Sequence, residues 1–111
     1  MNQKYERQLK KGVLDMLILK LLEQEAKYGY QLILELRDRS QELFSLKEGT
    51  LYPILYRLEE DKLVQSRWSE PDGKQVARKY YHITEKGKTV LQEIFSLWKN
   101  VSAQIDDIME G

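Results

Sequence analysis

The sequence predicts a mainly α-helical fold with a small β-hairpin, and three observations support this prediction. Apolar residues recur at intervals of three and four in four segments of the chain, which is the spacing of amphipathic helices. Residues 64–70 and 76–83 are instead rich in branched and aromatic side chains, as strands are. The length of 111 residues corresponds to one domain with a modest core.

The first predicted helix follows a charged segment, residues 1–11, that does not resemble a signal peptide. Its apolar residues cover almost the whole circumference: Val13, Leu14, Met16, Leu17, Ile18, Leu19, Leu21 and Leu22. A chain of this size offers little surface to cover such a helix, so we expect Leu14 to lie in an interface with a second copy. The longest apolar run, residues 16–19, is far too short to cross a bilayer, so we expect a cytoplasmic protein without a membrane partner.

A second helix is predicted from Tyr30, and it fades in the polar residues 37–42. Ser45 followed three residues later by Glu48 predicts a capping box, so we expect the third helix to begin there. Pro53 removes the backbone hydrogen bond to the Gly49 carbonyl. Either the third helix bends at that point, or Thr50 caps a later start.

The third helix has an apolar edge and a free face. The apolar edge consists of Leu51, Ile54, Leu55 and Leu58. By the helical period, the side chains opposite this edge and flanking it are Lys47, Gly49, Thr50, Tyr52, Pro53, Tyr56 and Arg57. Because both lie off the apolar edge, we expect Thr50→Ala and Tyr52→Ala to leave the fold intact.

The two predicted strands form a hairpin. Glu70, Pro71, Asp72 and Gly73 have the residue preferences of a type I turn, and Lys74 would make its tip basic. We expect Trp68 to pack beneath the hairpin. Tyr81 shares a strand face with Ile83, which predicts a core position.

Thr84 is predicted to cap a last helix whose apolar residues have a period of 3.5 rather than 3.6. This period is typical of a helix that packs against a partner helix. Residues 1–84 are therefore expected to form the main domain, and residues 85–111 a dimerisation helix packed on it. Besides Leu14, the expected dimer interface consists of Leu91, Ile94, Trp98, Val101, Ile105 and Ile108.

Composition excludes several classes of site. Without cysteine there is no disulfide framework or thiolate metal site, and a lone His82 provides neither a metal cluster nor a catalytic triad. We therefore expect no enzyme activity, no metal and no cofactor. The net charge is zero, which argues against nucleic-acid binding, but Lys74, Arg78, Lys79, Lys86 and Lys88 concentrate positive charge in the second half of the chain.

Three helices followed by a hairpin make a winged helix-turn-helix, an arrangement that carries one helix into a DNA major groove. The runs GTLYP at residues 49–53, YGY at 28–30 and RKYYHIT at 78–84 resemble the PadR family of bacterial transcriptional regulators, and the single last helix resembles its short subgroup. The likeness covers roughly residues 12–98. Lys62 departs from it, because the family usually has glycine there to end the third helix in a left-handed conformation.

The resemblance and the free face of the third helix together define the candidate sites. The candidate DNA-binding residues are Tyr30, Lys47, Gly49, Thr50, Tyr52, Pro53, Arg57, Lys74, Arg78 and Lys79. Trp98 occupies a position that resembles the drug-stacking tryptophan of a multidrug-sensing member, which implies an aromatic or cationic ligand bound with Ile94 and Val101. The alternative interpretation is that Trp98 only packs in the dimer interface.

The sequence thus predicts a homodimeric repressor that binds a palindromic, double-stranded DNA operator. A ligand bound at the dimer interface would release the repressor from the operator. A winged-helix module that binds other proteins and never contacts DNA is the alternative, supported by the neutral charge.

Overall fold

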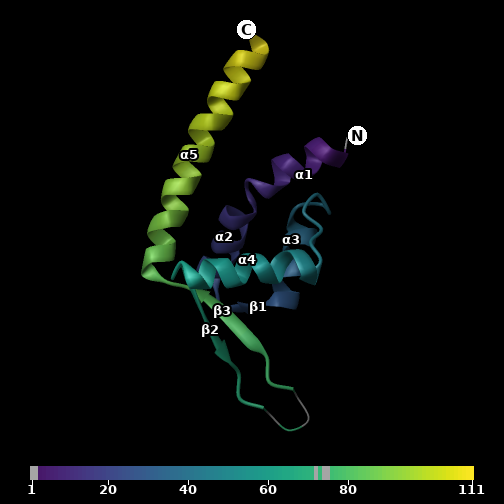
Figure 1. The fold of residues 1–111 in the computed structure, drawn as a ribbon, viewed down its shortest axis with the longest axis vertical. Coiled ribbons are helices and arrows are strands. Elements are labelled where there is room, and N and C mark those ends of the chain that lie inside the picture. The colour runs from purple at the N-terminus through teal and green to yellow at the C-terminus, as the bar shows by residue number, and fades with distance from the viewer. Residues whose placement is uncertain (1–2, 72, 74–75) are drawn as a thin grey trace.

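The structure is a computed structural model that describes residues 3–71, 73 and 76–111. A helix-rich body carries a three-stranded antiparallel sheet, with the strands in the order β1-β3-β2 (Figure 1). The elements in chain order are α1 (Gln3–Lys11), α2 (Leu14–Gln24), β1 (Lys27–Tyr28), α3 (Gly29–Arg39), α4 (Glu48–Glu60), β2 (Val64–Trp68), β3 (Lys79–Ile83) and α5 (Glu85–Glu110). The mainly helical fold class with a hairpin is confirmed.

Helix α2 supplies the centre of the core. Six of its residues are buried, and all of them except Leu14 belong to one cluster with Leu32 of α3, Leu51 and Leu55 of α4, and Tyr81 of β3. Leu14 is only 6% exposed within the single chain, so the expectation that a second copy must cover it is wrong. The preceding helix α1 was not predicted. Its only large apolar residues are Tyr5 and Leu9, too few to mark a helix by apolar periodicity, and none of its residues is buried.

The sheet pairs β2 with β3 in a register that places Val64 opposite Ile83 and Ser66 opposite Tyr81. Tyr81 is fully buried, as predicted. Both strands are shorter than the predicted ranges, although one further backbone bond joins the Ser69 N–H to the Arg78 carbonyl at 2.8 Å. The predicted turn lies partly outside the described residues, because Asp72 is not described. Lys74 lies outside them altogether.

The strand β1 was not predicted either. It is only two residues long, and it pairs Lys27 with Tyr81 and Tyr28 with Tyr80. A two-residue strand has no periodicity to detect, so only its partner on β3 reveals it. Lys27 is 3% exposed, and its ammonium donates to the Leu21 carbonyl at 2.8 Å and lies 3.5 Å from a Glu35 carboxylate oxygen. These contacts compensate its burial.

Helix α4 begins at Glu48, so the predicted capping box at Ser45 is wrong. The Ser45 hydroxyl instead donates to the Glu42 carbonyl at 2.8 Å, in a turn where Gln41 and Glu42 have φ angles of 53° and 69°. The alternative start after Thr50 is wrong as well, because the Thr50 N–H already donates to the Lys47 carbonyl. The helix continues through Pro53 to Glu60. Of its predicted apolar edge, Leu51, Leu55 and Leu58 are fully buried, whereas Ile54 is only partly buried.

The end of α4 and the start of α5 are joined at one corner. Lys62 has a φ of 64°, and the Leu63 N–H donates to the Leu58 carbonyl at 2.9 Å. This is a left-handed helix end, a conformation that favours glycine, and Lys62 adopts it with a full side chain. The Thr84 hydroxyl caps α5 as predicted, accepting from the Gly87 N–H at 3.0 Å, and it also donates to the Lys62 carbonyl at 2.7 Å.

Figure 1 shows α4 lying across the middle of the molecule, with the hairpin extending to one side and α5 to the other. The first turns of α5 pack on α2 through the buried Leu91, and the rest of the helix extends beyond the core. Its apolar residues Trp98, Val101, Ile105 and Ile108 are consequently 44–74% exposed. Among the described helices, none has the length and apolarity needed to span a membrane.

Candidate nucleic-acid interface

The exposed face of α4 is built around its N-terminal half. Gly49, Thr50 and Pro53 are exposed there, beside the N-cap residue Lys47. Gly49 has no side chain and that of Pro53 is short, and outside the helix's own backbone no heavy atom lies within 4 Å of where a Cβ at Gly49 would stand. At these two positions no long side chain projects from the helix, so another macromolecule can approach the backbone closely.

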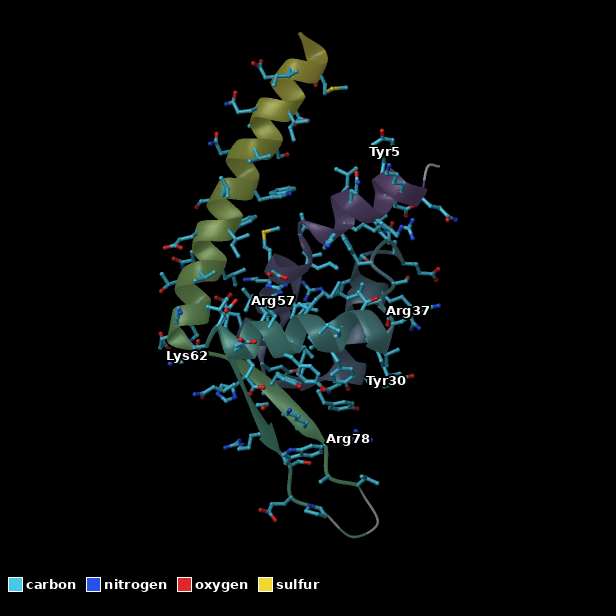
Figure 2. The ribbon with its side chains drawn as sticks, viewed as in Figure 1. Tyr5, Tyr30, Arg37, Arg57, Lys62 and Arg78 are labelled. Atoms are coloured by element: carbon cyan, nitrogen blue, oxygen red, sulfur yellow. The ribbon has the colours of Figure 1, made fainter. Side chains whose placement is uncertain are left out.

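A groove of about 540 Å³ runs between α4 and the hairpin, and we call it the wing groove. Aromatic and basic side chains from β1, α3, α4 and the hairpin line it: Tyr28, Tyr30, Tyr52, Tyr56, Trp68, Arg78 and Lys79. Figure 2 shows Tyr30 and Arg78 on the hairpin side of α4. Four of the ten candidate residues therefore line one groove, although they lie far apart in the sequence: Tyr30, Tyr52, Arg78 and Lys79.

The groove also contains three aromatic residues that the list of candidates lacks. Trp68 is 64% exposed, so the expectation that it packs beneath the hairpin is wrong. It lies at the end of β2, beyond the buried first residue Val64, where no core element remains to cover it. Tyr28 and Tyr56 were missed as site residues, although Tyr28 belongs to the YGY run and Tyr56 flanks the free face of α4.

The basic side chains of the wing groove lie against aromatic rings. The Arg78 guanidinium carbon is 4.5 Å from the centre of the Tyr28 ring, and Arg78 Nη1 donates to the Tyr28 hydroxyl at 2.7 Å. Lys79 Nζ lies 5.5 Å from the centre of the Tyr56 ring. Such cation–π contacts hold the charges in place without neutralising them. The groove can therefore bind an anion such as a phosphate.

Tyr52 has a structural role that the sequence did not reveal. It is half-buried and packs against the core, and a Cβ at Gly29 would overlap its phenol ring. Burial raises the pKa of the Tyr52 hydroxyl, with further contributions from Glu48 and Tyr56. We therefore revise the expectation for Tyr52→Ala: the substitution would empty the space over Gly29 and should lower the stability of the fold.

Arg57 does not lie in the wing groove. Figure 2 shows it on the opposite side of α4 from Tyr30, and its two terminal nitrogens bind the two carboxylate oxygens of Asp15 at 2.7 and 2.9 Å. Arg57 and Thr50 line a second hollow, which α1 and α2 close with Arg7, Lys11 and Asp15 among others. The free face predicted for α4 thus lies between the wing groove on one side and this second hollow on the other.

On α5, Trp98 stacks on Phe95 with ring centres 6.4 Å apart and planes 12° from parallel. Phe95 was missed because it stands outside the 3.5-residue seam, although it is the nearest aromatic side chain one helical turn before Trp98. It also lines an apolar groove between α2 and α5 with Met16, Leu17 and Leu91. Ile94 is partly buried, whereas Val101 is 45% exposed.

No group of His, Asp and Glu side chains suited to a metal ion occurs among the described residues.

Helices α2 and α3 pack in the core, α4 follows with one exposed face, and the hairpin lies beside it with the basic wing groove between them. This arrangement defines a winged-helix protein of the nucleic-acid-binding type. Residues 18–93 match the Transcriptional regulator PadR-like family, and the chain belongs to this family. The family consists of transcriptional regulators and not of enzymes.

Individual relatives are similar to the chain over most of their length. The chain is 38% identical over 102 residues to the uncharacterized protein X of Lysinibacillus sphaericus, covering 91% of this chain and 92% of that protein. The crystal structure of a PadR family transcriptional regulator from Eggerthella lenta is similar with a TM-score of 0.86 and 33% identity, over 97% of this chain and 91% of that one. That of a PadR-like transcriptional regulator from Bacillus cereus has a TM-score of 0.79 and 36% identity, over 94% and 98%.

Proposed function

We propose that this regulator is a homodimeric repressor that acts in the cytoplasm on a palindromic DNA operator. Helix α4 of each subunit would enter a major groove, and the wing groove would hold the flanking backbone. The observation that carries the proposal is the wing groove beside the exposed N-terminal half of α4, since Arg78 and Lys79 lie next to the helix that would read the bases. Phosphate contacts of this kind set the register of a protein on DNA.

The second subunit is supported by α5. The exposed residues Trp98, Val101, Ile105 and Ile108 repeat along one side of the helix at the spacing of a two-helix seam. Pairing the two copies of α5 would cover this side. It would also fix the separation of the two α4 helices, which has to match half-sites about 34 Å apart.

The experiment is a titration of DNA fragments, selected from the promoter region or from a random pool, by fluorescence anisotropy at several salt concentrations. We expect binding that weakens steeply with salt. Thr50→Ala should weaken it by about 1–3 kcal/mol without loss of stability. Tyr52→Phe replaces Tyr52→Ala as the test of the tyrosine hydroxyl, because it keeps the ring over Gly29.

Lys79→Ala and Lys99→Ala form a matched pair for the same titration. Each removes one positive charge, but Lys79 lines the wing groove whereas Lys99 lies on α5 beside Phe95. Only Lys79→Ala should weaken binding and reduce the salt dependence. Equal effects of the two variants would contradict the proposed interface. A wild-type protein that retards no DNA but captures a protein partner would instead support the interaction module.

A ligand at the dimer interface is the remaining part of the proposal, supported by the exposed, stacked pair Phe95 and Trp98. A flat aromatic compound, cationic or neutral, could insert beside these rings and change the angle between the subunits. Planar dyes should quench the tryptophan fluorescence of Trp68→Phe, in which Trp98 is the one remaining tryptophan. They should no longer bind to Trp98→Ala. Absence of quenching across a broad dye panel would leave Trp98 with a packing role only.

A further inference from the structure

Arg78 is the most restrained basic side chain of the wing groove. Its Nη1 donates to the Tyr28 hydroxyl at 2.7 Å, and its guanidinium stacks on the same ring. These contacts join residues 50 positions apart in the sequence. A guanidinium has five N–H donors, so this single bond leaves others free for a ligand. Within the described part of the chain, no carboxylate forms an ion pair with Arg78, although the side chain is exposed.

The backbone of Arg78 is restrained as well. Its N–H donates to the Ser69 hydroxyl at 2.8 Å, and its carbonyl accepts from the Ser69 N–H at the same distance. Arg78 directly precedes β3, so these bonds continue the hairpin by one residue pair. Both the main chain and the end of the side chain are therefore held before any partner arrives.

Tyr28 is itself firmly placed. It pairs with Tyr80 in the β1–β3 ladder, and the two rings meet edge to face with centres 5.3 Å apart. Its N–H donates to the Gln31 side chain at 3.1 Å at the start of α3. The short strand β1 thus fixes the Tyr28 ring at the base of the hairpin, where the Arg78 side chain reaches it.

We propose that Tyr28 is a positioning residue for DNA binding, which holds the Arg78 guanidinium ready for a backbone phosphate. This inference rests on the proposed function and adds a residue that the candidate list lacks. A long, flexible arginine loses conformational freedom when it binds, and this loss lowers affinity. Because the ring and hydroxyl of Tyr28 already confine Arg78, most of that loss occurs on folding and not on DNA binding.

The test compares Tyr28→Phe, Arg78→Ala and the double variant with the wild type, in the same anisotropy titration. Tyr28→Phe keeps the ring and the β1 pairing but removes the acceptor for Arg78. We expect it to weaken operator binding by about three- to tenfold, the cost of ordering one arginine. The salt dependence should stay unchanged, since the phosphate contact is still made. Arg78→Ala should reduce the slope of log K against log salt by about 0.9.

The double variant separates positioning from other roles. In the Arg78→Ala background, Tyr28→Phe should have no further effect, because there is no guanidinium left to orient. Tyr5→Phe, which removes an exposed hydroxyl on α1, is the matched control and should bind like the wild type. Thermal unfolding of each variant checks that the fold is retained.

Three results would overturn the inference: unchanged affinity of Tyr28→Phe, tighter binding by that variant, or a loss that persists in the Arg78→Ala background. The last would mean that the Tyr28 hydroxyl contacts DNA itself. These outcomes differ from failure of the proposed function. In that case the wild type binds no DNA in a salt-dependent way, and the positioning role falls with it.

Discussion

Arg57 of α4 and Asp15 of α2 form a two-pronged ion pair, with nitrogen–oxygen distances of 2.7 and 2.9 Å. It joins residues 42 positions apart and ties the exposed helix to the core helix. Because α2 also packs on α5, the pair lies on a continuous path from the proposed DNA-reading helix to the proposed dimer helix. Hydrogen bonding to Asp15 is the main cause that raises the pKa of the Arg57 guanidinium, which stays charged.

We expect the ion pair to contribute about 0.5–1 kcal/mol to stability, the upper range for exposed pairs with good geometry. The side chains are 52% and 32% exposed, so solvent screens their attraction. A double-mutant cycle of Asp15→Ala and Arg57→Ala in urea unfolding measures this coupling. Asp15→Ala also frees Arg57, so operator affinity should be retained or increase. A loss of DNA binding in Asp15→Ala equal to that in Arg57→Ala would show that the pair itself positions α4.

Lys62→Gly should stabilise the protein by about 0.5–1 kcal/mol. The φ of 64° at Lys62 is a left-handed conformation that glycine adopts without the penalty of a Cβ. The exposed lysine side chain makes little packing that would be lost. Chemical denaturation should show a higher midpoint at an unchanged slope. A lower midpoint would mean that the gain in flexibility of the unfolded chain exceeds the relief of strain.

Gly87→Ala should destabilise the protein by roughly 1–3 kcal/mol, as overpacking does. A Cβ at Gly87 would overlap the Leu63 carbonyl, a backbone atom at the corner between α4 and α5 that cannot move aside freely. Gly49→Ala is the matched control, since Gly49 also lies in the first turn of a helix but faces open space. Its stability should equal or exceed that of the wild type. Similar unfolding midpoints for both variants would contradict the close approach at Gly87.

Tyr81→Phe should leave stability at neutral pH unchanged or higher. The Tyr81 ring is fully buried, and its hydroxyl has no hydrogen-bond partner among the described residues. A buried phenol without a partner has a desolvation cost that phenylalanine avoids. A loss of more than about 1 kcal/mol in urea unfolding would reveal a partner for the hydroxyl.

The same residue predicts a pH dependence. Burial raises the pKa of Tyr81 to about 12, against about 10 in an unfolded chain. The folded protein therefore binds the phenolic proton more tightly, so this contribution to stability is complete below pH 10 and is lost as the pH rises toward 12. Tyr81→Phe should lose less stability across this window than the wild type. The pKa of Tyr52 is raised as well, so Tyr52 also contributes to the pH dependence, and the difference between the two curves is what reports on Tyr81.

Local sequence patterns predicted the apolar faces of most helices and one helix cap, although they missed α1 and the start of α4. The apolar edge of α4 and the Thr84 cap of α5 depend on neighbours within a few residues, whereas the left-handed position at Lys62 was indicated only by the family resemblance. The alternation that predicted the hairpin is local as well. The motifs at Tyr28, Gly49 and Arg78 likewise indicated the family before any contact was known.

Tertiary structure alone decided what those residues contact. The Ser45 hydroxyl binds the turn after α3 instead of capping α4, Arg57 pairs with Asp15, and Trp68 lies exposed because the hairpin extends past the core. The strand β1 exists only because β3 lies beside it. Side chains choose partners by proximity in space, and periodicity along the chain carries no information about residues 42 or 50 positions away. The placement of Arg78 on Tyr28 is therefore a property of the fold and not of either motif.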